Sequence, residues 1–446
     1  MTGTIAAIAT PPGQGAISLL RVSGPDALAV CQRVLRARAL LPRLQTHGFI
    51  LNASGEIVDE VLATYFPAPK SYTGEDVVEI SCHGGLLVTR SVYETLLTAG
   101  ARPAAPGEFT QRAFLNEKLD LTQAEAVMDL ISAQTALAQR SALAQLRGKL
   151  GQKIESLRQE LIGVIAHIEA HIDFPDEDIA PDTAGQLVSR LGTLITNIQA
   201  LATTAFEGRI LREGVRTVIC GEPNSGKSSL LNQLAGYDRA IVASQAGTTR
   251  DTIEEAINLR GIPLRLVDTA GLRDSADFVE REGIARSTRE ISGAELVLEV
   301  IDGHIPPPEA ASRVQPQAEA IHLRILNKAD LGLDPRWQVL QEGFSVISCE
   351  TGDGLEAFKD RIIAALFRDS RPLNSPEVTV NARHLHALQA AEQRLLHAVS
   401  GLERNIATEL PAADLRSALH HLDEILGKTD IESILAEIFS SFCIGK

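Results

Sequence analysis

The fold is decided by the stretch "RTVICGEPNSGKSS", residues 216–229. An apolar, strand-forming run is followed by a glycine-bounded loop, and the loop by the helix-forming run "SLLNQLAG". Gly221, Gly226 and the pair Lys227-Ser228 have the spacing of a P-loop, whose backbone N–H groups and helix N-terminus face phosphate oxygens. In such a loop the lysine reaches the β- and γ-phosphates and the hydroxyl of Ser228 binds Mg²⁺. The stretch therefore predicts a nucleoside triphosphate site.

Two further motifs follow in the order that a GTPase requires. "GTTRD", residues 247–251, supplies Thr249, which we expect to bind Mg²⁺ and to sense the γ-phosphate. "DTAG", residues 268–271, follows the strand-forming run "LRLV". Its Asp268 is expected to hold Mg²⁺ through water, and its Gly271 N–H to meet the γ-phosphate.

The fourth motif, "NKAD" at residues 327–330, predicts the base. The Asp330 carboxylate can accept hydrogen bonds from both N1–H and N2–H of guanine, a pair of donors that adenine lacks. The usual guanine-contacting "SAK" is replaced by Ser348-Cys349-Glu350, so a backbone contact can remain but the lysine is lost. The predicted nucleotide contacts are Gly221, Asn224, Ser225, Gly226, Lys227, Ser228, Ser229, Thr248, Thr249, Asp268, Thr269, Ala270, Gly271, Asn327, Lys328, Asp330 and Ser348.

One position departs from the Ras-like pattern, in which a glutamine after DTAG orients the attacking water. Here that position is Leu272, which cannot polarise water. The alternatives are a carboxylate in "DSADFVEREG", residues 274–283, or a cation other than Mg²⁺.

The pattern along the chain predicts a multidomain protein with α/β and all-α parts, in line with a length of 446 residues. Residues 1–118 are expected to form an α+β domain, and 119–208 the first part of a helical domain. Residues 209–371 alternate between strand and helix patterns, which is typical of a parallel sheet covered by helices. Helices resume in 372–446, so we expect the G domain to be inserted into the helical domain.

Composition excludes several other classes. No run approaches the roughly 18–20 apolar residues that span a bilayer, and no basic segment precedes the first apolar residues. The five cysteines are scattered, which favours reduced thiols and a cytoplasmic location. The formal net charge of −15 argues against binding nucleic acid over the whole surface, although a local basic surface remains compatible with it.

These motifs occur together with "ATPPGQGAISLLRVSG", "SYTGEDVVEISCHGG", "RPAAPGEFTQRAFLNEKLDLTQAEAVMDLI" and a terminal "FCIGK". In this combination the whole chain resembles the bacterial tRNA-modification GTPases of the MnmE (TrmE) family. The resemblance implies an N-terminal domain that binds folate and dimerises. It also implies a flavin-dependent partner (MnmG, also called GidA) that carries FAD and joins the protein in a heterotetramer. Together they would add an aminomethyl-type group to C5 of the wobble uridine, position 34, of certain tRNAs, with a 5,10-methylene- or 5-formyl-tetrahydrofolate as the one-carbon source.

The resemblance also assigns ions and a catalytic carboxylate in the G domain. Asn224 matches an asparagine that helps to hold K⁺ beside the phosphates, with Ala243, Gln245 and Thr248 in the adjoining segment. Glu280 matches the glutamate that orients the attacking water, which would compensate for Leu272. Mg²⁺ would be held by Ser228, Thr249 and Asp268, the last through water. The implied activity is GTP hydrolysis stimulated by potassium.

For folate, the matching residues are Arg21, Glu79, Lys118 and the terminal Lys446. Arginine and lysine suit the carboxylates of the glutamate tail, and a carboxylate suits the N–H and NH₂ edge of the pterin. Cys443, in "FCIGK", would belong to the modification centre as a catalytic thiol. A prenylated cysteine is the alternative for that ending, but Gly445 and Lys446 fit its pattern poorly and the preceding helix is acidic.

A regulatory or ribosome-assembly GTPase without modification activity is the competing function. The G-domain motifs do not separate it from the modification enzyme. The folate-type blocks of the N-terminal part and the lack of an added basic RNA-binding module favour modification.

Overall fold

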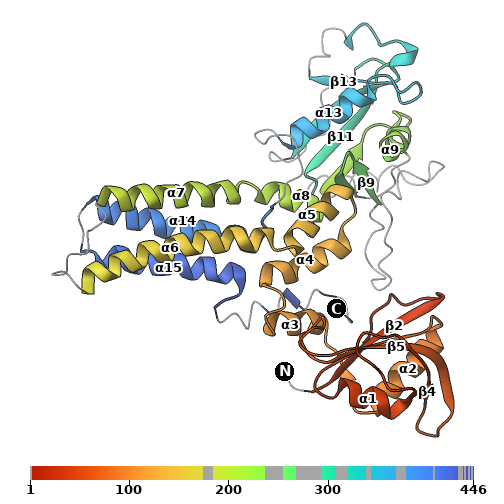
Figure 1. Cartoon of the computed structure of the whole chain (residues 1–446). Helices are drawn as coiled ribbons and strands as arrows, with labels where there is room; N and C mark the ends of the chain where they lie inside the picture. The colour runs from red at the N-terminus through yellow and green to blue at the C-terminus, as the bar shows by residue number, and fades with distance from the viewer. Residues whose placement is uncertain are drawn as a thin grey trace. The chain divides into compact units, whose positions relative to one another are not determined.

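The computed structural model describes most of the chain (Figure 1). The described residues are 3–173, 184–236, 255–267, 293–307, 320–337, 343–367, 378–404 and 407–429, with Leu435, Ile438, Phe439, Phe442 and Gly445. They divide into two compact units. One unit comprises 1–128, 145–199 and 386–446, and the other 129–144 and 200–385.

The N-terminal part is built on a seven-stranded sheet in the order β3-β4-β5-β6-β2-β1-β7. Its elements are β1 (Ile5–Ile8), β2 (Ile17–Ser23), α1 (Ala27–Val34), β3 (Leu35–Ala37), β4 (Thr46–Leu51), β5 (Ile57–Phe66), β6 (Val77–His83), α2 (Leu86–Thr98), β7 (Arg102–Pro103) and α3 (Glu108–Leu115). Alternation of buried and exposed residues along β2 and β6 gives the sheet one apolar face. Side chains from α1 and α2, among them Val30 and Val92, pack with that face in one hydrophobic core.

The helical part follows from long runs with apolar residues at three- and four-residue spacing. Its helices are α4 (Leu121–Ser132), α5 (Ala136–Leu146), α6 (Lys149–Asp173), α7 (Ala184–Ala202), α8 (Ala205–Glu213), α14 (Ala382–Glu403) and α15 (Glu409–Leu426). Figure 1 shows α6, α7, α14 and α15 side by side. Arg158 of α6 pairs with Asp423 of α15 at 2.5 Å, and Gln199 of α7 donates to Glu392 of α14 at 2.6 Å. Two helices that precede the second sheet in the sequence, α6 and α7, and two that follow it, α14 and α15, therefore form one bundle.

The second sheet has the order β13-β12-β11-β8-β10-β9. Its elements are β8 (Val215–Cys220), α9 (Lys227–Ala235), β9 (Glu255–Leu259), β10 (Ile262–Leu266), β11 (Leu296–Asp302), β12 (Ile321–Asn327), the 3₁₀ helix η2 (Ala329–Leu331), β13 (Phe344–Val346) and α13 (Leu355–Leu366). All neighbouring strands are parallel except β9, which pairs antiparallel with β10. That edge strand is not predicted from the sequence pattern.

The observed architecture confirms the predicted fold class. An α+β N-terminal part, a helical bundle and a P-loop G domain are present, and the G domain interrupts the helical sequence between α8 and α14. The domain boundaries at 118, 208 and 371 stay a prediction.

The end of the chain packs against the N-terminal part of the same unit. Phe439 and Phe442 belong to a hydrophobic cluster with Leu121 and Ala124 of α4. Gly445 lies against the backbone of Ile8–Ala9, so closely that a Cβ there would meet the Ile8 carbonyl at 2.6 Å.

Candidate functional site

The loop between β8 and α9 has the geometry of a P-loop. Gly221 and Gly226 have φ angles of +140° and +100°, a region that favours glycine. A Cβ on Gly221 would collide with the carbonyl of Val300 in β11, and one on Gly226 with the side-chain amide of Asn327. The two glycines therefore let the loop pack closely against the ends of β11 and β12. The backbone N–H groups of the loop and the N-terminus of α9 are the groups that bind phosphate in a P-loop.

Two side chains are suited to binding an anion here: Ser225 in the loop and Lys227 at the start of α9. The Nζ of Lys227 donates to the carbonyl oxygens of Gly221 at 3.0 Å and Glu222 at 2.8 Å, and burial lowers the pKa of the lysine. Ser225 is 1% exposed, and its Oγ has no hydrogen-bond partner within the described part of the chain. A buried hydroxyl without a partner costs about 1–3 kcal/mol, so this loop is suited to gaining a polar ligand.

Asn327, at the end of β12, connects the P-loop to the loop after β13. Its Nδ2 donates to the carbonyl of Ser225 at 2.9 Å, and its Oδ1 accepts from the N–H of Cys349 at 3.1 Å. The residue is 2% exposed. From α9, Gln233 donates to the Cys349 carbonyl at 2.8 Å. The phosphate side and the base side of the predicted site are thus joined by direct hydrogen bonds.

Asp330 lies in η2 with its carboxylate fixed from one side. The hydroxyl of buried Ser348 donates to Asp330 Oδ1 at 2.5 Å and accepts from the N–H of Thr351 at 3.1 Å. Asp330 itself is exposed, so its carboxylate is oriented and accessible. The preceding Lys328 has φ +65° and pairs with Asp302 at the end of β11 at 2.6 Å.

The thiols near this site are poor nucleophiles. Burial raises the pKa of Cys220 to about 12 and that of Cys349 to about 11. A thiol is reactive mainly as the thiolate, so both remain unreactive near neutral pH.

Several predicted site residues lie outside the described residues. They are Ala243, Gln245, Thr248, Thr249, Asp268, Thr269, Ala270, Gly271, Glu280, Cys443 and Lys446. Ser228 and Ser229 are described, and both are exposed in the first turn of α9. Asn224 is exposed at the tip of the loop with φ +62°.

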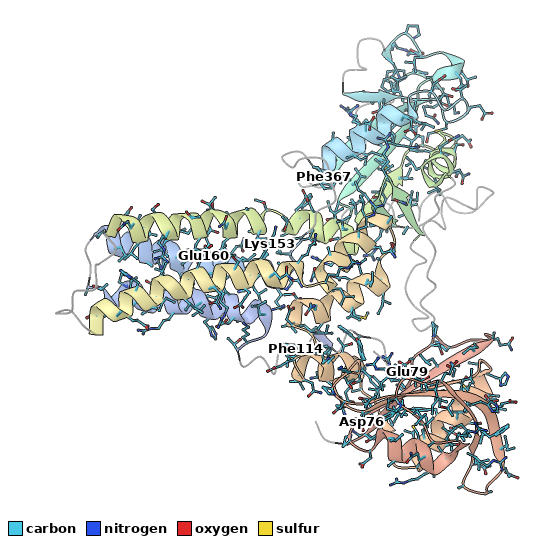
Figure 2. The ribbon with its side chains drawn as sticks, in the orientation of Figure 1. Asp76, Glu79, Phe114, Lys153, Glu160 and Phe367 are labelled. Atoms are coloured by element: carbon cyan, nitrogen blue, oxygen red, sulfur yellow. The ribbon has the colours of Figure 1, made fainter. Side chains whose placement is uncertain are left out.

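In the N-terminal sheet, Arg21 and Glu79 face each other across β2 and β6. Both Nε and Nη2 of Arg21 donate to Glu79 Oε1, at 3.0 and 2.7 Å. The guanidinium also lies 5.0 Å from the ring centroid of Tyr72 and 5.7 Å from that of Phe109. Figure 2 labels Glu79 in this sheet. The structure therefore brings these two predicted folate residues together, while exposed Lys118 lies beside Gly74.

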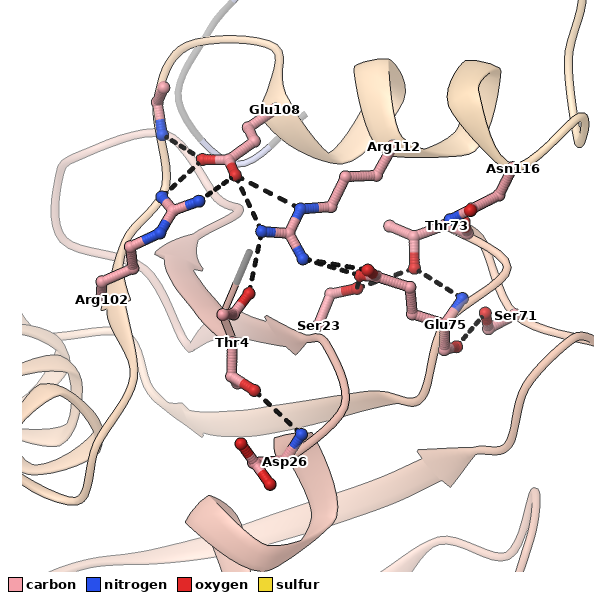
Figure 3. Close-up of polar contacts among 12 residues, drawn as sticks. Thr4, Ser23, Asp26, Ser71, Thr73, Glu75, Arg102, Glu108, Arg112 and Asn116 are labelled. Carbon is pink, nitrogen blue, oxygen red and sulfur yellow. Dashed lines mark hydrogen bonds and ion pairs between the residues drawn. The ribbon is translucent and has the colours of Figure 1, made fainter. Parts of the chain in front are cut away.

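A buried ion network beside this pair was missed by the sequence analysis (Figure 3). Glu108 accepts from Arg102 and Arg112, and Arg112 also donates to both carboxylate oxygens of Glu75. Burial by itself would raise the pKa of Glu108, but the bonds from Arg102, the Ala105 N–H and Arg112 lower it to about 2. The network ties α3 to the loop that carries Tyr72 and Gly74. Its only sequence signal is the helical i, i+4 spacing of Glu108 and Arg112.

The described ranges contain no group of three or more His, Cys, Asp or Glu side chains arranged to hold a metal. Within the same ranges, no helix has the length and apolar character needed to cross a bilayer.

A P-loop joined by Asn327 to an oriented Asp330 carboxylate defines a P-loop protein of the GTPase class. The MnmE helical domain model matches residues 121–443, and the model of the GTP-binding protein TrmE N-terminus matches residues 4–118. The tRNA modification GTPase MnmE of Akkermansia muciniphila is 51% identical over 99% of both chains, and that of Aquifex aeolicus is 42% identical over 100% of both. The chain belongs to the MnmE family of tRNA modification GTPases. Among solved structures, the G domain of the T. maritima FeoB iron transporter is 26% identical over 34% of this chain and 98% of its own, with a TM-score of 0.25.

Proposed function

We propose that this protein hydrolyses GTP to drive the modification of tRNA at C5 of the wobble uridine, position 34. A tetrahydrofolate supplies the one-carbon unit, and a flavin-dependent MnmG-type partner carries FAD. The modification takes place in the cytoplasm. The protein forms a homodimer through its N-terminal domain and binds the partner in a heterotetramer.

The observation that carries the nucleotide half of the proposal is the bridge made by Asn327. It links the loop that would bind the phosphates to Cys349, next to the Ser348 that orients Asp330. Asp330 would accept from the guanine N1–H and N2–H. Phosphate oxygens would replace the Gly221 and Glu222 carbonyls as partners of Lys227 Nζ. The unpartnered Ser225 hydroxyl supports a polar ligand in the same loop.

The donor set also fits the two proposed cations. The Ser228 hydroxyl stands in the first turn of α9, where the family pattern puts Mg²⁺, with Thr249 and Asp268 as its other proposed contacts. Asn224, exposed at the loop tip, would offer an amide oxygen to K⁺ together with Ala243, Gln245 and Thr248. The positive charge of K⁺ would stabilise the charge that develops on the phosphates during hydrolysis, and Glu280 would orient the water.

The folate half of the proposal rests on the Arg21–Glu79 pair. Both side chains occupy one position of the β2–β6 ladder and are partly accessible, with 16% and 26% of their surfaces exposed. A carboxylate acceptor next to guanidinium donors matches the amino and carbonyl edge of a pterin. Because Arg21 is bonded to Glu79, we propose that both residues hold this end of the ligand, whereas the residue type of Arg21 alone favours the glutamate tail. Lys118 and Lys446 would take the carboxylates of the glutamate tail, and Cys443 would act at the modification centre.

The test is nucleoside analysis of tRNA after incubation with the protein, GTP, a methylene-tetrahydrofolate, an amine donor and the flavin partner. We expect the modified uridine to form, and to form faster in K⁺ than in Na⁺. In Asp330→Asn an amide N–H would face the guanine donors, so GTP hydrolysis and modification should both fall while 5-formyl-tetrahydrofolate still binds.

If the protein is instead a regulatory or ribosome-assembly GTPase, the modified wobble uridine should not depend on it. A strain that lacks the protein would keep its modified wobble uridine and accumulate ribosome precursors. Equal hydrolysis rates in K⁺ and Na⁺ would remove the potassium site from the proposal.

A further inference from the structure

The N-terminal sheet has a second face that α1 and α2 do not cover. Arg21 lies opposite Glu79 in the β2–β6 ladder, and Ile17 lies opposite His83. Because side chains alternate along a strand, Glu79 and His83 point to the same face, four residues apart. At about 3.3 Å per residue, their Cα atoms are roughly 13 Å apart along β6. His83 therefore lies on the same face of the sheet as the proposed folate residues.

Both carboxylate oxygens of Asp59 contact His83. Asp59 Oδ1 lies 2.7 Å from His83 Nδ1, and Asp59 Oδ2 accepts from the backbone N–H of His83 at 2.8 Å. The Asp59 side chain is only 10% exposed, whereas that of His83 is 68% exposed. The acceptor at Nδ1 fixes the proton on that nitrogen in the neutral ring, which leaves Nε2 as the exposed, exchangeable position.

A neighbouring pair shows what an ordinary surface contact looks like on this sheet. His47 Nε2 lies 2.7 Å from Glu60 Oε1, with both side chains more than half exposed and a single contact between them. Asp59 differs because it uses both oxygens on His83 and is itself nearly buried. An arrangement of this kind orients an imidazole, as the carboxylate does in a catalytic His–Asp pair.

The surroundings of His83 favour its protonated form. The facing charged groups are Asp59 and Glu60, both on β5, and the hydrogen bond to Asp59 is the main cause of the raised pKa of His83. The facing residue of β2, Ile17, is uncharged, and the first turn of α2 carries no acidic residue. Ile17 is 66% exposed, so an apolar side chain lies open beside His83 on this face.

We propose that His83, oriented by Asp59, is a catalytic acid for the one-carbon transfer at the folate site of this sheet face. In a methylene-tetrahydrofolate the bond between the transferred carbon and one folate nitrogen breaks, its electron pair stays on that nitrogen, and the proton on Nε2 of His83 is delivered there. The carbon stays bonded to the other folate nitrogen, whose lone pair forms a second bond to it, and is then attacked by C5 of the uridine. The imidazolium becomes a neutral imidazole. This assignment rests on the proposed function, because it needs an elongated substrate anchored at Arg21–Glu79 and lying along β6.

The experiment compares His83→Gln with the matched variant His47→Gln in the full-length protein with its flavin partner. Loss of a general acid typically costs a factor of 10²–10⁴, so we expect tRNA modification by His83→Gln to fall about 100-fold or more. GTP hydrolysis and the affinity for 5-formyl-tetrahydrofolate should stay within twofold of wild type. His47→Gln should match wild type in all three. Equal, small losses in both variants would overturn the assignment.

Asp59→Asn tests the dyad through pH. A general acid must be protonated, so the modification rate should decline as pH rises through the pKa of His83. The amide removes the main cause of the raised pKa, so this decline should begin at lower pH in Asp59→Asn. Histidine NMR of the protein without substrate provides a second readout: the His83 titration should shift to lower pH in the variant.

Two outcomes separate this inference from the proposed function. If the wild-type protein fails to bind 5-formyl-tetrahydrofolate, the proposed function itself fails. If wild type binds it and His83→Gln modifies tRNA at the normal rate, only the catalytic role of His83 is lost. A variant that loses the dimer in sedimentation, with activity lost in proportion, would also overturn the assignment and make His83 an interface residue.

Discussion

Asn327 illustrates how one buried side chain organises a site made of distant segments. Its amide makes one bond to the P-loop and one to the loop after β13, over sequence separations of 102 and 22 residues. The NKAD motif predicts a contact from this asparagine to the nucleotide. Its two hydrogen bonds in the structure instead connect the P-loop to the loop after β13.

Replacement of Asn327 by alanine should therefore weaken both halves together. It leaves the Ser225 carbonyl and the Cys349 N–H without their partner, and each lost buried bond costs about 1–1.5 kcal/mol. We expect the affinity for GDP and for GTP to fall by roughly 10- to 100-fold, measured by titration of a fluorescent nucleotide. Asn232→Ala, at an exposed position of α9, is the control and should bind normally. A variant that loses GTP affinity alone would contradict the joining role.

Glu108 gives a pH-dependent prediction for the N-terminal part. Its pKa is about 2 in the folded protein against 4.5 ordinarily, so its contribution to stability is present above about pH 4.5 and is lost as pH falls through about 2. Glu108→Gln removes the charge partner of Arg102 and one of the two carboxylates that buried Arg112 contacts, and should lower the unfolding free energy by about 3 kcal/mol at pH 7. The difference from wild type should shrink as pH decreases below 4.5.

Thermal unfolding of both proteins between pH 3 and pH 7 measures this effect. Glu94→Gln is the matched control, because Glu94 pairs with Arg90 on an exposed helix surface. Such pairs contribute about 0–1 kcal/mol. Equal losses from the two variants, or a Glu108 effect that does not change with pH, would show that the network does not depend on ionised Glu108.

At the scale of elements, two glycines without a Cβ allow the C-terminal segment to pack closely against α3 and α4. Gly107 begins α3 with φ +66°, and a Cβ there would lie 2.9 Å from both the Phe439 carbonyl and Phe442 Cβ. Gly427 ends α15 in the same backbone region and packs against Phe114. Close backbone approach at these positions brings the end of α15 and the residues after it against α3 and α4.

Gly107→Val should displace the C-terminal segment from α3. A β-branched residue is strained at positive φ, and its Cβ would clash with two backbone-linked atoms of the segment. We expect faster hydrogen exchange in peptides from residues 429–446 and faster trimming by carboxypeptidase, with nucleotide affinity unchanged. Gly55→Val is the control, because Gly55 also has positive φ (+81°) but has open space around it. Equal exchange in the two variants would mean that backbone strain alone accounts for the effect.

At the scale of the whole molecule, the G domain interrupts a bundle whose other helices contact one another directly. Arg158 and Asp423 are 265 residues apart in sequence, and Gln199 and Glu392 are 193 apart, yet both pairs are hydrogen-bonded. Helices that precede the inserted domain in the sequence therefore pack directly against helices that follow it. This is expected when the two ends of an insertion lie close together.

Replacement of residues 200–385 by a short Gly/Ser linker should leave the first unit folded. Apolar faces of α6, α7, α14 and α15 would still be buried against one another, and a flexible linker adds little closure cost because that cost grows slowly with length. We expect unchanged hydrogen-exchange protection of α6 and α15 and retained binding of 5-formyl-tetrahydrofolate, with no GTP binding. Loss of protection in both helices would show that the bundle needs the inserted domain.

The strands and helices were largely predictable, because their signals are local. The apolar run before Gly221 and the helical pattern from Ala382 appear in the structure as β8 and α14. The antiparallel edge strand β9 was not anticipated, since a short mixed run such as "EAINL" carries a weak pattern. The inserted arrangement was predicted from the order of the patterns, and the family membership from motifs that extend over the whole chain.

By itself, the sequence determined the class of fold, the P-loop and the guanine-specific turn, because each depends on residues a few positions apart. The tertiary structure alone decided that Asn327 joins the two loops, that Arg21 and Glu79 share one ladder position, and that nearly buried Asp59 orients His83. It also decided the Glu108–Arg112–Glu75 network. Apart from the i, i+4 pair of Glu108 and Arg112, these contacts depend on strand register and on packing between residues 20 to more than 100 positions apart, and no local pattern in a single sequence specifies that register.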